Sequence, residues 1–278
     1  MLRIGLSTNG IEHDERFADA IKAGITDIEI SRSYQDETEV IDYKGLKKLS
    51  DVYGVNLWSF HLPFAHDVSL CIESLDDNIR KFSLDFLSEH IKRATDIGIN
   101  KIVIHGSSEP IKIEERLEKM KRSKEALNKL AEVAYLGGAV LAVENLPRTC
   151  LGNDSIELKE LISVHDNLKV CFDVNHLLKE DHATFIKNLG DKIVTTHISD
   201  YDFVDERHWL PGEGNIDWKN LYALLKGINY QGVFMYEVPF TINTLTRERP
   251  LEYADYVKNA TEIFSGKNIT VLPLEKHV

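Results

Sequence analysis

Eight short apolar runs alternate along this chain with longer stretches whose apolar residues recur at helical spacing. The runs are rich in Ile, Val and Phe and have the length of strands, whereas the longer stretches have the period of amphipathic helices. The helical spacing is clearest over 77–97, 113–136 and 218–225. This alternation predicts an α/β fold built on a parallel sheet. The strand-like runs cover residues 2–7, 26–31, 55–63, 101–107, 139–146, 168–174, 192–199 and 232–238.

The number of strand–helix units distinguishes between the two common α/β architectures. Eight units close a single (β/α)8 TIM barrel, and 278 residues suit that fold, which typically has roughly 250. The alternative is an open doubly wound sheet, which usually carries a glycine-rich phosphate loop after its first strand. The first run of this chain is not followed by such a loop. Since no linker-like or low-complexity tract divides the chain, we expect one TIM-barrel domain over residues 1–278.

Composition excludes several classes of function. The chain has 33 Lys and Arg against 45 Asp and Glu, a formal charge of −12, which disfavours a general polyanion binder but leaves a local basic groove open. No apolar stretch approaches the roughly 20 residues of a membrane helix. Cys71, Cys150 and Cys171 lack the spacing of a disulfide framework or a zinc–thiolate site. The N-terminal run is typical of a strand rather than a signal peptide, so we expect a cytoplasmic location.

Four consecutive apolar runs each end in a residue that can bind a metal. In a barrel the C-terminal strand ends open onto one face, so these side chains are expected to meet in one pocket. Three carboxylates and one imidazole are a ligand set for a divalent cation, whether Mn, Zn, Mg or Co. The four residues are Glu144, Asp173, His197 and Glu237.

Each of these residues also has a purely structural interpretation. Glu144 and Glu237 could form ion pairs with Arg or Lys at the barrel rim. Asp173 stands at a strand–helix junction, where Asp often caps a helix. His197 could be a hydrogen-bonded core histidine. Their common position at the ends of neighbouring strands favours the metal hypothesis.

A second set of polar residues is expected around this pocket. These residues either bind a polar substrate beside one metal or hold further metals. The alternatives are hydrogen-bonded core histidines and a solvated loop, although long loops on this face of a barrel are usually functional. The set comprises His61 and His105 at the ends of the third and fourth runs, His176 after Asp173, and Glu206, Arg207 and His208 in the long segment 201–217.

This combination of residues suits proton transfer on a sugar. A divalent cation held by two adjacent sugar oxygens polarises a carbonyl and stabilises the enediolate formed when the neighbouring carbon loses a proton. Glu144 and Glu237 are the pair expected to remove and return that proton. If the two carboxylates lie on opposite faces of that carbon, the result is epimerisation. If one group moves the proton between adjacent carbons, the result is isomerisation. His61, His176 and Arg207 would orient hydroxyls or a phosphate, and a non-ligating base is the alternative to the two glutamates.

The order of these motifs resembles the xylose isomerase-like TIM-barrel superfamily. The match spans most of the chain, as FHLP, IHGS, VENLP, FDVNH, THISD, LPGEGNIDW and YEV. One branch, the sugar isomerases and epimerases, implies one metal on the residues matching Glu144, Asp173, His197 and Glu237. In that branch the residues matching Glu144 and Glu237 are catalytic, and the histidine matching His176 contacts substrate.

A second branch is endonuclease IV, a zinc phosphodiesterase that acts on abasic DNA with three metal ions. Its further ligands match His61, His105, His176 and His208. Its Asp–Arg–His loop motif is here Glu206–Arg207–His208, with Glu in place of Asp. Inosose dehydratase-like lyases are further relatives of the same scaffold.

Three features favour the sugar branch over endonuclease IV. The charge is negative, the segment LPFAHDVSL after His61 lacks that enzyme's Tyr- and Asn-containing stretch, and His105 precedes Gly–Ser–Ser rather than Pro–Gly. We therefore expect a metal-dependent isomerase or epimerase of a small-molecule sugar or sugar phosphate. Nucleic acid and membrane partners are not expected, whereas a homo-oligomer is compatible because barrels of this type often pair.

Overall fold

The structure, a computed structural model, describes residues 3–9, 14–34, 41–65 and 69–277. Eight parallel strands lie in the order β7-β6-β5-β4-β3-β2-β1-β8, and β8 pairs with β1. Next to β7 the ring closes through a single parallel bridge between Ile198 and Tyr236. The predicted (β/α)8 barrel is therefore confirmed. The strands are β1 Arg3–Asn9, β2 Asp27–Ser33, β3 Asn56–Phe64, β4 Lys101–His105, β5 Val140–Glu144, β6 Leu168–Asp173, β7 Ile193–His197 and β8 Val233–Tyr236.

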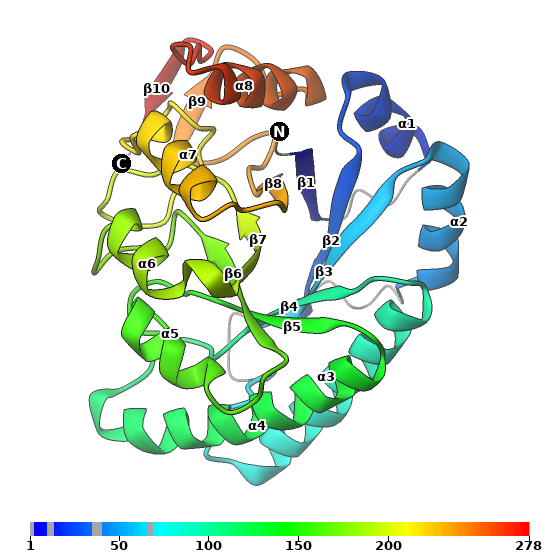
Figure 1. The fold of residues 1–278 in the computed structure, drawn as a ribbon, viewed down its shortest axis with the longest axis vertical. Coiled ribbons are helices and arrows are strands. Elements are labelled where there is room, and N and C mark those ends of the chain that lie inside the picture. The colour runs from blue at the N-terminus through cyan, green and yellow to red at the C-terminus, as the bar shows by residue number, and fades with distance from the viewer. Residues whose placement is uncertain (1–2, 10–13, 35–40, 66–68, 278) are drawn as a thin grey trace.

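The helices surround the strands on the outside of the barrel (Figure 1). Several begin at an Asp whose side chain accepts a backbone N–H of the first turn, including Asp42, Asp76, Asp154, Asp181 and Asp217. Such caps satisfy donors that the helix itself leaves free. The helices are α1 Asp14–Ala23, α2 Tyr43–Tyr53, α3 Asp77–Asp96, α4 Arg116–Leu136, α5 Ser155–Ile162, α6 His182–Leu189, α7 Trp218–Gly227 and α8 Tyr253–Ser265, with short 3₁₀ turns η2 Ile113–Glu115 and η3 Gly190–Lys192.

The strand ends lie where the sequence predicts them. β5, β6 and β7 end on Glu144, Asp173 and His197, and Glu237 is the residue after β8. β4 ends on His105, whereas β3 continues three residues beyond His61 to Phe64. Because all eight strands are parallel, these side chains share one end of the barrel.

Outside the barrel, a small hairpin joins β9 Leu245–Arg247 to β10 Leu274–Lys276 in antiparallel register. The C-terminal segment thus packs on its own chain, and β9 has no counterpart in the predicted elements. The three cysteines are buried free thiols, in agreement with the sequence. Among the described helices, none is both long and apolar enough to cross a membrane.

The long segment after β7 is fixed by one buried carboxylate. Asp200 accepts the backbone N–H groups of Tyr201 at 2.9 Å, Gly212 at 2.8 Å and Ile216 at 3.1 Å, and the indole N–H of Trp218 at 2.8 Å. These bonds join both ends of the segment to the strand end beside His197. An irregular segment with this many ties has a defined shape despite its lack of regular structure.

We expect Asp200→Ala to lower the free energy of unfolding by about 3 kcal/mol, because several buried donors lose a charged acceptor. Urea denaturation followed by circular dichroism measures this loss. Asp191→Ala, at an exposed carboxylate of η3, is the control and should change stability by less than about 0.5 kcal/mol. A loss below about 1 kcal/mol for Asp200→Ala would contradict this role.

Candidate metal centre

The four strand-end residues converge on one point. Glu144, Asp173, His197 and Glu237 each offer one donor atom, and these atoms all lie within 4.8 Å of one another. His197 Nδ1 is 3.4 Å from Glu144 Oε1, 3.4 Å from Glu237 Oε2 and 3.8 Å from Asp173 Oδ2. The structure thus brings together the ligand set that the sequence predicts.

Unsatisfied polar atoms show that this cluster fits a cation. Within the described part of the chain, Asp173 Oδ2, His197 Nδ1 and Glu237 Oε2 are buried without a hydrogen-bond partner. Each such atom costs about 1–3 kcal/mol unless something binds it. Oxygen and imidazole donors aimed at one point suit Mn, Mg, Zn or Co. Cys171 lies beside Glu144 and His197 as a further possible ligand, and burial raises the pKa of its thiol well above the usual value.

A fifth buried group, Glu29 of β2, holds His197 in place. Its carboxylate lies 2.9 Å from His197 Nε2 and accepts the hydroxyls of Ser7 at 2.9 Å and Ser59 at 2.7 Å. Because Nε2 faces Glu29, the other ring nitrogen, Nδ1, faces the carboxylates of Glu144, Asp173 and Glu237. A carboxylate behind the histidine is the usual support of a metal-binding imidazole.

Sequence reasoning missed Glu29, although a signal was present. The residue stands between Ile28 and Ile30 inside an apolar strand-like run. An acid in such a position must be paired when buried. The register of β2 against β1 and β3, which sets Glu29 beside Ser7 and Ser59, emerges only from the fold.

The pKa values of the two glutamates in the cluster are shifted in opposite directions. Burial opposes ionisation of Glu144, but the charge of His197 and hydrogen bonds from His105 and His176 outweigh it, so its pKa lies well below the usual value. For Glu237, burial and repulsion from Glu144 and Asp173 raise the pKa well above the usual value, against the attraction of His197. Two carboxyl groups with separated pKa values are the arrangement of an acid–base pair.

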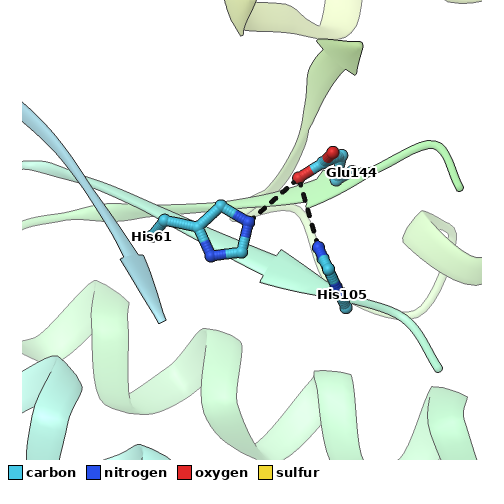
Figure 2. Close-up of side chains that lie close together, drawn as sticks. All are labelled: His61, His105 and Glu144. Atoms are coloured by element: carbon cyan, nitrogen blue, oxygen red, sulfur yellow. Dashed lines mark hydrogen bonds and ion pairs between the residues drawn. The ribbon is translucent and has the colours of Figure 1, made fainter. Parts of the chain in front are cut away.

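Two histidines approach Glu144 from the neighbouring strands, as Figure 2 shows. His61 Nε2 is 3.1 Å from Glu144 Oε2, and His105 Nε2 is 3.6 Å from the same oxygen. His61 Nδ1 lies 2.8 Å from the carbonyl of Leu62. Since a carbonyl only accepts, Nδ1 donates in this contact, and Nε2 faces the Glu144 carboxylate. These three residues form a second potential metal-binding group.

A third potential metal-binding group consists of His176, Glu206 and His208. His176 Nε2 lies 3.1 Å from Glu206 Oε2. The Nδ1 atoms of His176 and His208 lie 3.0 and 3.1 Å from the carbonyls of Asn145 and Glu237. Burial disfavours the His176 cation, yet the charges of Asp173, Glu144 and Glu206 raise its pKa well above the usual value.

A cavity of about 490 Å³ opens onto these groups. Its polar lining includes His61, His105, Glu144, His176, Glu206, His208 and Glu237. Asp173 and His197 are fully buried and do not contribute to that lining.

The positions of two arginines differ from what the sequence predicts for this cavity. Arg207, expected to orient substrate, does not line the cavity in the described structure and instead pairs through Nε with Asp202 Oδ2 at 2.9 Å. Arg148, which sequence reasoning did not single out, does line it. Its position four residues after Glu144, on the catalytic face, was the available signal.

Comparison with known proteins identifies the family. The sequence model of the xylose isomerase-like TIM barrel matches residues 17–256. The chain therefore belongs to that family, as the motifs predict.

Its relatives are distant. The chain is 29% identical over 203 residues to the uncharacterized protein MJ1311 of Methanocaldococcus jannaschii, which covers 70% of this chain and 68% of that protein. It is 24% identical over 253 residues to fructoselysine 3-epimerase of Shigella flexneri, covering 83% and 88% of the two chains.

Two solved structures share the fold. A D-tagatose 3-epimerase-like protein has a TM-score of 0.81 at 22% identity and covers 95% of this chain and 97% of its own. The 3-keto-D-glucoside 4-epimerase YcjR of E. coli has a TM-score of 0.76 at 18% identity, with 95% and 100% covered. At these identities the likeness establishes a common barrel.

We expect Glu29→Gln to weaken Zn²⁺ binding about 10- to 100-fold while the protein stays folded, because His197 loses its charged support. Competition with a chromogenic chelator measures the affinity. Asp27→Asn is the matched control: it removes another buried carboxylate of β2, one that pairs with Arg3 and Asn56 instead. Equal affinity in wild type and Glu29→Gln would show that Glu29 does not support the centre.

Proposed function

We propose that this protein is a metal-dependent sugar epimerase or isomerase that transfers a proton at the carbon next to a carbonyl. The carrying observation is the convergence of Glu144, Asp173, His197 and Glu237 on one point beside a cavity that both glutamates line. The names of the relatives, fructoselysine 3-epimerase and D-tagatose 3-epimerase-like protein, support a sugar substrate.

The two oxygens of each glutamate allow two tasks. Glu144 directs Oε1 to His197 and Oε2 to His61 at the cavity wall. Glu237 buries Oε2 against His197, yet its side chain is 25% exposed, which leaves the other oxygen open to the cavity. One oxygen of each residue thus suits a cation, and the other suits the substrate.

A divalent cation held by Glu144, Asp173, His197 and Glu237 would supply Lewis-acid polarisation of the substrate carbonyl. Glu144 and Glu237, which both line the cavity, would then remove the proton from the adjacent carbon and return one to it. Transfer from opposite faces inverts the carbon and gives an epimer. His176, on the cavity wall, is placed to contact a substrate hydroxyl.

We expect Glu144→Gln and Glu237→Gln each to reduce epimerisation at least about 100-fold, because an amide neither accepts nor returns the proton. Chromatography of products from D-tagatose, D-psicose and fructoselysine measures activity, and thermal unfolding checks the fold. The chelated wild type, before and after Mn²⁺ is restored, is the control. Wild-type turnover in either variant would refute the acid–base assignment.

A second candidate is a zinc phosphodiesterase of the endonuclease IV kind. The observation in its favour is that two further groups that could hold a metal line the cavity, one formed by His61, His105 and Glu144 and the other by His176, Glu206 and His208. In His61, His176 and His208, Nδ1 contacts a backbone carbonyl, as in many metal-binding histidines, and Nε2 of His61 and of His176 faces a glutamate of its own group.

Metal counting separates the two candidates. For the epimerase we expect about one ion per chain in protein purified without chelator, unchanged in His208→Ala, as measured by plasma mass spectrometry. The phosphodiesterase predicts two or three zinc ions, loss of one in His208→Ala, and cleavage of an abasic-site duplex. Cleavage at low enzyme concentration would overturn the epimerase proposal.

A further inference from the structure

Arg148 stands at the cavity rim and is bound by three carboxylates. Its guanidinium pairs side-on with Glu109, reaches Asp205 Oδ1 at 2.7 Å and contacts Glu206 Oε1 at 3.0 Å. These contacts tie the segment after β5 to those after β4 and β7. Together the four residues form an acidic rim, with side chains 29–43% exposed.

The acidic rim carries a net charge of −2, since three carboxylates surround one guanidinium. Arg148 is the sole Lys or Arg among the described residues that line the cavity. Deeper in the site, Glu144, Asp173 and Glu237 offset the charge of a divalent cation. Among the described residues that line the cavity, a phosphate would therefore meet no Lys or Arg free of carboxylate partners.

Apolar side chains from the end of β3 and from the segments after β5 and β8 also line the cavity. Space beside these side chains can hold a short carbon chain attached to the sugar, and a cavity of about 490 Å³ lies in the range that accommodates more than a small fragment. The apolar residues are Phe64, Leu146, Pro147, Val238, Pro239, Phe240 and Ile242.

We propose that the cavity selects an unphosphorylated sugar and favours one that carries an amine on a short apolar chain. This inference rests on the proposed sugar chemistry and names its substrate class. The cation of the amine would lie against Glu109 and the acidic rim while the sugar reaches the metal centre. A phosphate ester at the same position would meet like charge, and it would bind well only after Arg148 left its three partners.

Measurements of ligand affinity test this inference independently of catalytic turnover. The ligands are a free ketohexose, its 6-phosphate, and the same ketohexose with an aminopropyl ether on its 6-hydroxyl, titrated calorimetrically into Mn²⁺-loaded protein at low salt. We expect the amine to bind at least as tightly as the free sugar and the phosphate at least about tenfold more weakly, with both differences shrinking as salt rises. Tighter binding of the phosphate, or weaker binding of the amine than of the free sugar, would overturn the inference. Absence of epimerisation despite the expected order would refute the proposed function alone.

A matched pair of variants locates the effect. Glu109→Gln keeps an oxygen acceptor for Arg148 and removes one rim charge, so we expect the preference for amine over phosphate to fall about threefold, as for one partly exposed charge pair. Glu160→Gln makes the same change on α5, where Glu160 pairs with Lys124. This control should leave the preference unchanged. An unchanged preference in Glu109→Gln, or an equal fall in both variants, would contradict selection by the acidic rim.

Discussion

The burial of several carboxylates around one imidazole is the constraint on which this structure depends. Glu29, Glu144 and Asp173 are almost entirely inaccessible to solvent, and Glu237 joins them around His197. Carboxylates crowded in this way repel one another and lose hydration, which destabilises the fold unless positive charge compensates. The apolar barrel offsets this cost, and the cluster is the kind of locally unfavourable arrangement that proteins retain for binding or catalysis.

Rigid elements hold the centre, and loops shape access to it. The ligands stand at strand ends, where the ladder fixes the backbone, and Glu29 fixes the imidazole from behind. Asp200 fixes the segment that carries Glu206 and His208. Arg148 then joins this segment to the neighbouring loops. A metal centre on strands beneath a rim of ion-paired loops allows substrate preference to change without disturbing the chemistry.

The sequence predicts the barrel and the central ligands for one reason: the end of a buried strand is visible in its composition, and parallel strands all end on the same face. Glu144, Asp173, His197 and Glu237 follow from that rule. The contact of Glu29 with His197 does not follow from it, because that contact depends on the register of the strands. The position of Arg148 cannot be predicted in this way either. Its partners Glu109 and Asp205 come from two other loops, and no local sequence pattern predicts the conformation of those loops. Arg207 illustrates the same limit, because its side chain turns to Asp202.

The most direct test of the account is the position of a bound ion. Anomalous diffraction from crystals grown with Zn²⁺ should show a peak about 2.0–2.2 Å from His197 Nδ1 and from oxygens of Glu144, Asp173 and Glu237. Absence of a peak among these four residues, in crystals that bind Zn²⁺ elsewhere on the chain, would contradict the claim that this cluster is the metal centre.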